Sequence, residues 1–243
     1  MGFIYSYIFS YFYHSKKIKM KSISKTTLDF LKELKENNTR EWFNEHKPAF
    51  QVEQTKAKEF YNALMERLKT HDEIESVKIF RIYRDVRFSK DKTPYKPHFA
   101  GNFVRGTKRL RGGYYLRIRP GESFLAGGFW EPNKDDLLRI RKEFEMDTSE
   151  IREILNDKNF VKHFGKLKGD ALKTAPRGFD KEHPDMDLIR MKQFIVTREF
   201  TDEEVLNPNF IEEIGVSFKA MRPYFDYMSE ILTTDLNGVS TID

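Results

Sequence analysis

The middle of the chain alternates short runs of β-branched and aromatic residues with turns that contain glycine or proline. The runs are VKIFRIYRDVRF (77–88), HFAGNFV (98–104), GYYLRIRP (113–120), SFLAGGFW (123–130) and, further along, MKQFIVTREF (191–200). Residues of these types favour strands, and short Gly/Pro turns join antiparallel neighbours. The sequence therefore predicts a central antiparallel β-meander of about five strands.

The first run, residues 77–88, also fits a helix, because its apolar residues follow the i, i+3, i+4, i+7 rule. The β-branched and aromatic residue types favour a strand. One face of that strand would carry Phe80, Ile82, Arg84, Val86 and Phe88, and the other Arg81, Tyr83, Asp85 and Arg87. A guanidinium among apolar neighbours is costly to bury alone, so we expect Arg84 to pair with a carboxylate or to reach a ligand.

Helical patterns lie on both sides of the predicted strands. Residues 24–37 place leucines at helical spacing behind Ser and Thr, a second helix begins near Thr39, and a third runs from about Pro48 to Lys69. The start signals after the strands are Asn133, a capping box of Asp147 with Glu150, His183 with Pro184 at the first helical position, and a capping box of Thr201 with Glu204. A last helix covers roughly 208–232, and the order of elements predicts an α+β fold.

The predicted domain is a single one, over residues 20–233. Residues 1–19 begin with an apolar stretch followed by lysines, which is not the charge order of a secretory signal. They are expected to lie outside the domain, either as an interfacial segment or because translation starts at Met20. Residues 234–243 are expected to fray.

Composition excludes several kinds of protein. The chain has 243 residues, with 14% aromatic and 33% charged residues, so it can bury a sizeable core and is not expected to be disordered. It has no cysteine, which rules out disulfides and thiolate sites and fits a cytoplasmic protein. No run of about twenty apolar residues occurs, so no membrane-spanning helix and no integral membrane contact are expected.

Positive charge is concentrated in residues 78–119. This segment holds thirteen Lys or Arg against Asp85 and Asp91, a local charge of +11 in a chain whose net charge is +5. Arginine forks suit phosphate and carboxylate oxygens, and lysines act as point charges. The residues expected to bind such a ligand are Arg81, Arg84, Asp85, Arg87, Lys90, Lys92, Tyr95, Lys96 and His98, closed by Arg177 and Lys192 from a later segment.

The expected ligand is a phosphorylated or carboxylated small molecule. Asp85 would hold the arginine forks, and Tyr95 and His98 would donate protons if a reaction occurs. No catalytic residue, cofactor or metal site is predicted, because there is no GxSxG or Walker sequence and the surroundings of His98, Asp85 and Asp91 would repel a divalent cation. Whether the protein is an enzyme, and its oligomeric state, stay open.

Two other functions remain compatible with the same residues. A nucleic-acid-binding module would add Lys108, Arg109 and Arg111. Stacking surfaces for it would come from Tyr114, Tyr115, Arg117 and Arg119. The alternative, which the pattern favours, is that Tyr114, Leu116 and Ile118 form the core face. Alternatively, the arginines brace the sheet through salt bridges, and partner proteins bind elsewhere.

Three segments together resemble a known family. FRIYRDVRFSKDKTPYKPHF, GGYYLRIRPGESFLAGGFWEP and PRGFDKEHPDMDLIRMKQF are similar to an uncharacterised, mainly bacterial family called domain of unknown function 2461. The resemblance covers about residues 24–232. It implies one self-contained cytoplasmic domain, and it transfers no activity or catalytic residue.

Overall fold

The computed structural model describes residues 22–242, and the expectations for residues 1–19 lie outside them. The five strands are β1 (Ile74–Ile79), β2 (Phe99–Arg105), β3 (Gly113–Ile118), β4 (Ser123–Phe129) and β5 (Phe194–Phe200). The helices are α2 (Lys25–Glu36), α3 (Arg40–Glu45), α4 (Lys47–Leu68), α5 (Lys134–Met146), α6 (Ser149–Asn156), α7 (Lys158–Phe164), α8 (Met186–Ile189), α9 (Asp202–Leu206), α10 (Phe210–Ala220) and α11 (Arg222–Ile231).

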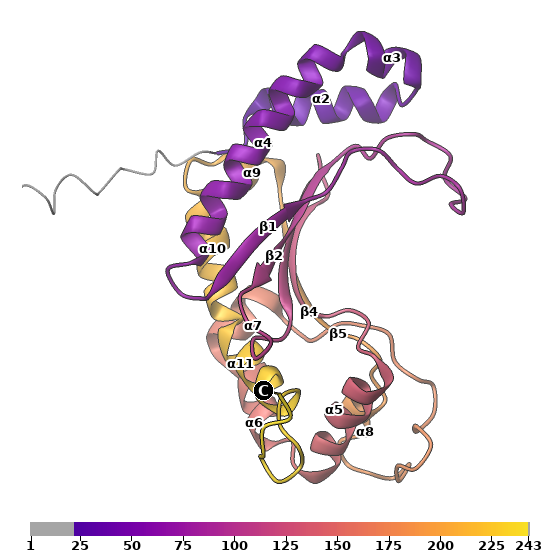
Figure 1. The fold of residues 1–243 in the computed structure, drawn as a ribbon, viewed down its shortest axis with the longest axis vertical. Coiled ribbons are helices and arrows are strands. Elements are labelled where there is room, and N and C mark those ends of the chain that lie inside the picture. Colours follow the sequence, from indigo (N-terminus) through magenta and orange to yellow (C-terminus); the bar gives the residue numbers. More distant parts are fainter. Residues whose placement is uncertain (1–21, 243) are drawn as a thin grey trace, which may run out of the picture.

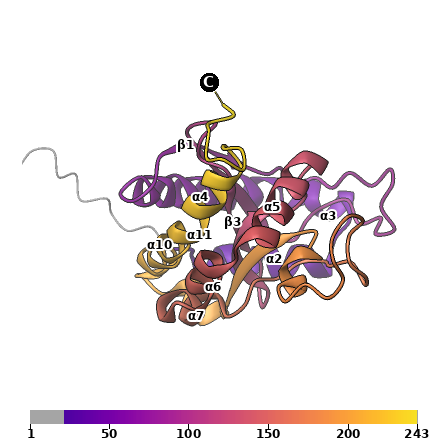
Figure 2. The ribbon, with the colours of Figure 1, turned by 90° about the horizontal axis from the view of Figure 1, so that it is seen from below.

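The strands form one antiparallel sheet in the order β1-β2-β3-β4-β5, with neighbours in the sheet also neighbours in the chain. The α+β class and the five-stranded meander are therefore confirmed. Figure 1 shows that the sheet is strongly bent, with α4, α10 and α11 along its convex side, and Figure 2 shows the same molecule from below. The concave side faces the opening between the loop after β1 and the region of α5 and α8.

Several helix starts are confirmed at the atoms that cap them. The side chains of Ser24 and Thr39 accept hydrogen bonds from the first turns of α2 and α3, and Asn133 does the same for α5. Thr201 and Glu204 form the complete capping box of α9. These bonds satisfy backbone N–H groups that have no partner inside a helix.

Other predicted helix boundaries are wrong. Asp147 accepts a hydrogen bond from Ser149 N (2.8 Å), but α6 begins after Thr148, without a capping box. The predicted last helix divides at Met221, because Pro223 has no N–H to continue the ladder. Pro184 precedes α8 rather than starting it, and His183 Nδ1 accepts from Asp185 N.

The predicted strand over residues 77–88 is wrong beyond Ile79. Phe80 N still donates to Ala100 O, but β2 begins at Phe99, so the residues that follow have no neighbouring strand. They form a long loop, residues 80–98, whose two arms meet at an isolated bridge between Tyr83 and Tyr95. The alternation of buried and exposed side chains expected over residues 80–88 does not continue to its end, since Phe88 is 95% exposed.

The core lies between the convex face of the sheet and the helices. Tyr61 of α4 is fully buried and donates to the carbonyls of Phe99 and Leu116, so it joins the helix to two strands. Gly127 of β4 allows α11 and its start to approach closely, because a Cβ there would lie 2.1 Å from Met221 Sδ. Helix packing on this side thus requires a glycine in the strand.

A polar network is buried at one end of the sheet. The Arg105 and Asp72 side chains are 0% and 1% exposed, and Arg105 Nε donates to Asp72 Oδ2 (2.8 Å). The Tyr114 hydroxyl donates to the same oxygen (2.6 Å), and Arg222 Nη1 lies 3.0 Å from Asp72 Oδ1. Arg84 pairs with a carboxylate as expected, that of Asp91 (3.0 Å), but its side chain is 26% exposed, whereas that of Arg105 is fully buried.

The C-terminal residues make a closed turn rather than an extended end. Thr234 and Ser240 form an isolated bridge, and Thr241 N donates to Thr233 O (2.9 Å). Across residues 22–242 the structure has no helix with the length and apolarity that a membrane span requires.

The buried network generates a stability prediction. We expect Asp72→Ala to lower the free energy of unfolding by about 3–5 kcal/mol, because Arg105 would stay buried without its carboxylate. Urea unfolding followed by circular dichroism measures the change. Asp85→Ala, which removes an exposed carboxylate, serves as the control and should change stability little. Equal losses in the two variants would contradict this account of the network.

Candidate functional site

The concave face of the sheet carries every second residue of each strand, opposite the core. Asn102 of β2 pairs with Tyr115 of β3, and Tyr115 pairs with Ala126 of β4. Arg117 of β3 pairs with Phe124 of β4. The face thus combines aromatic rings, an amide and a guanidinium in one register.

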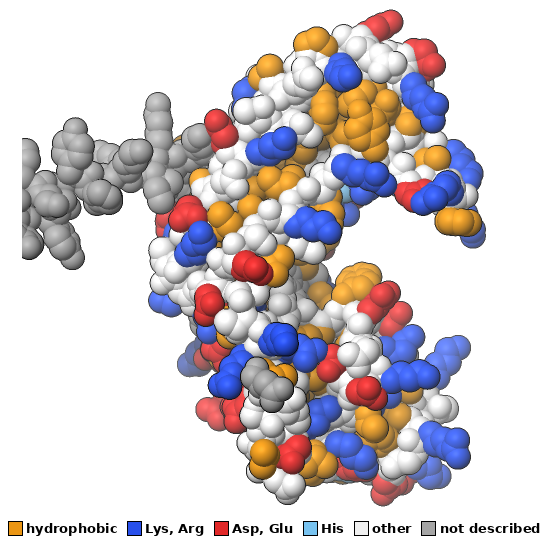
Figure 3. All heavy atoms as spheres, in the orientation of Figure 1, with side chains coloured by type: hydrophobic (Ala, Val, Ile, Leu, Met, Phe, Trp, Pro, Cys, Tyr) orange, Lys and Arg blue, Asp and Glu red, His pale blue; other side chains and the backbone are white. Residues whose placement is uncertain are grey.

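A cavity of about 950 Å³ lies over this face. The side chains that line it include Phe80, Asn102, Val104, Tyr115, Phe124 and Trp130. Figure 3 shows the molecule hollowed here, below a loop rich in Lys and Arg. The volume lies within the range of small-molecule sites, roughly 300–1,000 Å³.

Aromatic rings form the floor of the cavity. The ring centroids of Phe80 and Tyr115 are 6.4 Å apart, and those of Tyr115 and Phe124 are 5.5 Å apart. The Arg117 guanidinium lies over the Phe124 ring, 4.3 Å from its centroid. An aromatic surface of tilted rings therefore continues into a positively charged group.

The end of the face next to the long loop holds five basic side chains, which we call the cation cluster: Arg84, Lys96, His98, Arg117 and Arg119. His98 directly precedes β2, and the pairing of Phe99 with Ile118 places it beside the end of β3. The pKa of His98 is lowered to about 4. Burial is the largest cause, and the positive charges of Arg117, Arg119, Lys96 and Arg84 add to it. Loop cations and sheet cations therefore act on one imidazole.

Three nitrogens of the cation cluster are buried without a hydrogen-bond partner in the described part of the chain, namely Arg84 Nε, His98 Nδ1 and Arg119 Nε. Within residues 22–242 the cluster forms ion pairs only with Asp91, which contacts Arg84 (3.0 Å), and Glu122, which contacts Arg119 (3.2 Å) and Arg117 (3.8 Å). Four permanent cations thus face two carboxylates. Both observations are typical of a site that takes an anion.

The other predicted residues of the loop make local contacts within the loop or are exposed. Arg87 holds Asp85 with two bonds (3.0 and 2.7 Å), and this hydrogen bonding lowers the pKa of Asp85. Lys92 Nζ donates to Val86 O (2.9 Å). Arg81 and Lys90 are exposed.

Tyr95 anchors the loop instead of facing the cluster. It is 4% exposed, and its ring stacks on Phe43 of α3 with the centroids 3.9 Å apart. Asn38 binds its backbone on both sides, because Tyr95 N donates to Asn38 Oδ1 and Asn38 Nδ2 donates to Tyr95 O. Burial raises the pKa of Tyr95, which weakens it as a proton donor.

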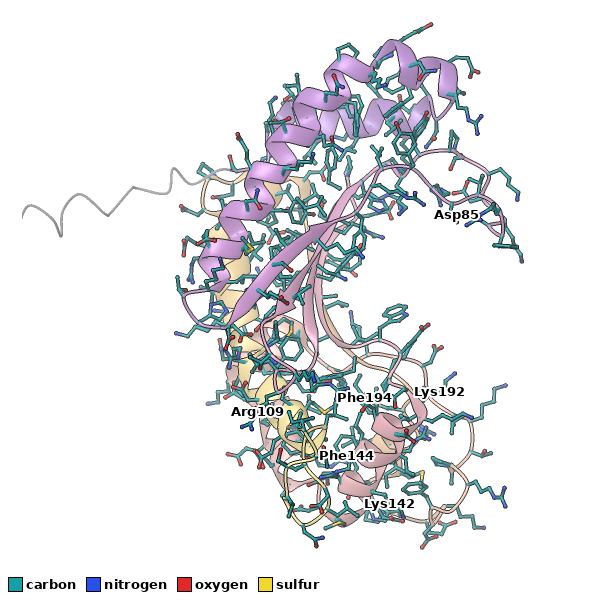
Figure 4. All side chains as sticks on the ribbon, viewed as in Figure 1. Asp85, Arg109, Lys142, Phe144, Lys192 and Phe194 are labelled. Atoms are coloured by element: carbon teal, nitrogen blue, oxygen red, sulfur yellow. The ribbon has the colours of Figure 1, made fainter. Side chains whose placement is uncertain are left out.

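Arg177 and Lys192 are not brought to the cluster. Figure 4 shows Asp85 and Lys192 on opposite sides of the opening, and Lys192 Nζ lies 3.8 Å from Asp170. Arg177 is exposed in the loop that leads to α8.

The loop between β2 and β3 carries Lys108, Arg109 and Arg111, the three basic residues that a nucleic-acid-binding module would add. Figure 4 places Arg109 at the opposite end of the sheet from Asp85. Arg111 in this loop is engaged by Asp136 and by the carbonyl of Leu232.

Sequence reasoning missed Asn102, Phe124 and Trp130 as parts of this face. The available signal was the alternation of their strands, which had already separated Tyr115, Arg117 and Arg119 from the core residues Tyr114, Leu116 and Ile118. Among residues 22–242, no group of three or more His, Asp and Glu residues is arranged to hold a metal ion.

The low pKa of His98 generates a prediction about acid stability. A histidine in the unfolded chain has a pKa of about 6.5, so it binds a proton before folded His98 does as the pH falls. Stability that neutral His98 contributes is complete above about pH 6.5 and is lost as the pH falls towards 4. The free energy of unfolding of His98→Gln should therefore decrease less between pH 7 and 4.5 than that of the wild type, by roughly 1–2 kcal/mol.

Urea unfolding at the two pH values measures this difference. His71, whose pKa burial also lowers to about 4, keeps the variant partly acid-sensitive. An equal decrease in wild type and variant would contradict the placement of His98.

Comparisons with known proteins identify the chain only at the level of a family. No curated protein and no solved structure matches it. A family model described as conserved hypothetical protein (DUF2461) matches residues 26–227, which include every strand and the cation cluster. The chain belongs to this DUF2461 family.

Proposed function

We propose that the cation cluster binds the phosphate or carboxylate group of a small ligand that lies along the concave face. The observation that carries this proposal is the group of three buried, unpartnered nitrogens on Arg84, His98 and Arg119. An unpartnered buried donor costs free energy, roughly 1–3 kcal/mol, and more if it is charged. Anion oxygens would accept hydrogen bonds from the two arginine nitrogens, and from His98 Nδ1 when it carries the ring proton, so binding recovers this cost.

The charge balance supports a phosphate. Arg84, Lys96, Arg117 and Arg119 exceed their two carboxylates by two positive charges. A phosphate monoester carries about two negative charges at neutral pH. Arg81 and Lys90, exposed on the same loop, would raise the rate at which an anion reaches the site.

The state of His98 sets its role. With a pKa of about 4, His98 is neutral at pH 7 and cannot donate an imidazolium proton in the free protein. An anion beside it favours the protonated form and raises its pKa. Any acid role of His98 would therefore arise only after the ligand binds.

The two other hypotheses receive less support. The pairs Arg84–Asp91 and Arg87–Asp85 contain side chains that are 26–77% exposed, and exposed pairs brace a fold weakly. A nucleic-acid strand would have to extend from the loop that carries Asp85 to the loop that carries Arg109, at the far end of the sheet. A compact anion needs only the cation cluster.

The binding of inorganic phosphate tests the proposal. Phosphate added to the full chain should raise the pKa of His98, followed by NMR of its ring protons, by roughly one unit or more. Arg119→Gln removes one cation of the cluster and should at least halve that rise. Lys192→Gln, on the opposite side of the opening, is the matched control and should leave the rise unchanged.

Circular dichroism of each variant shows whether the fold is intact. A His98 pKa that does not respond to phosphate, or that responds equally in the wild type and in Arg119→Gln, would overturn the proposal.

A further inference from the structure

The aromatic floor and the cation cluster share one strand. Tyr115, Arg117 and Arg119 alternate along β3 and its end, so they project from the same face at intervals of about 6.6 Å. Arg117 joins the two regions, since it contacts the Phe124 ring and its charge acts on His98. A ligand bound beside Arg117 would therefore be one side-chain interval along the strand from Tyr115.

Tyr115 offers a preorganised surface for a flat ring. Its own ring is held between Phe80 and Phe124, and it lines the cavity. Aromatic neighbours on both sides limit the movement of the side chain, so stacking on it costs little conformational entropy.

Asn102 adds a polar group beside this surface. It lies opposite Tyr115 on β2, lines the cavity and is exposed. Its amide makes no hydrogen bond to any residue from 22 to 242, so both its donor and its acceptor remain available. An amide of this kind recognises the edge of a heterocycle that presents one donor and one acceptor.

From these positions we infer that the ligand of the concave face is a nucleotide, with its base against Tyr115 and Asn102 and its phosphate at the cation cluster. The inference rests on the proposed function, because it uses the same anion site. A sugar phosphate would leave the Phe80–Tyr115–Phe124 floor unused, and a simple aromatic acid would leave the Asn102 amide unused. The cavity of about 950 Å³ includes Asn102, Tyr115 and Phe124 in its lining and has room for a base, and the phosphate would lie beyond that lining, beside Arg117.

Calorimetric titration of the full chain with four nucleoside monophosphates (adenosine, guanosine, cytidine and uridine), ribose 5-phosphate and inorganic phosphate tests the inference. At least one nucleotide should bind roughly tenfold more tightly than ribose 5-phosphate, which is the gain expected from one stacked base. Tyr115→Leu should abolish this advantage, and Asn102→Ala should reduce the discrimination among the four bases. Phe88→Leu, at an exposed position outside the cavity, is the matched aromatic control and should bind like the wild type.

The His98 pKa, measured in the same samples, separates failure of this inference from failure of the proposed function. If phosphate raises that pKa but no nucleotide binds more tightly than ribose 5-phosphate, the nucleotide assignment is overturned and the anion site stands. If neither phosphate nor any nucleotide changes the pKa, both fail. Binding of oligonucleotides without binding of mononucleotides would also overturn the inference, in favour of a single-stranded nucleic acid.

Discussion

The rest of the structure depends on the buried ion pair of Asp72 and Arg105, which fixes one end of the sheet. Asp72 follows α4, Arg105 ends β2, and Tyr114 of β3 and Arg222 of α11 bind the same carboxylate. Helices and strands that are distant in the chain are thus joined at one buried charge. Because a buried ion needs its partner, this end of the sheet has little freedom to rearrange. The convex face is thereby held against its helices.

Holding one face of the sheet leaves the other available. The helices α4, α10 and α11 line the convex side, and the bend turns the opposite face into the wall of a cavity (Figure 1). The loop after β1 brings Arg84 and Lys96 to the end of that face, and the stacking of Tyr95 on Phe43 anchors the loop there. Of its two acidic residues, Asp91 pairs with Arg84 and Asp85 with Arg87. The charges of Arg84 and Lys96 from this loop act on His98 together with those of Arg117 and Arg119. The fold thus concentrates positive charge beside an apolar surface.

Local features were predictable from the sequence, and long-range partners were not. Strand composition and turn residues predicted five strands, and the alternation along β3 predicted the core residues Tyr114, Leu116 and Ile118 correctly. The basic stretch was identified, but its residues divide among the cluster, exposed pairs and the packing of Tyr95. A charge pattern cannot show that Arg105 reaches Asp72, or that residues 81–88 lose their strand neighbour where β2 begins. Those outcomes depend on the register of the whole sheet.

The most direct test of the central claim is a crystal structure of the full chain with and without inorganic phosphate. Phosphate should lie at the end of β3, within hydrogen-bond distance of Arg119 and of Arg84 or His98, with Asp72 and Arg105 unchanged. Phosphate bound only at exposed lysines, with Arg84, His98 and Arg119 bonded to protein groups instead, would rule out an anion site at the cation cluster.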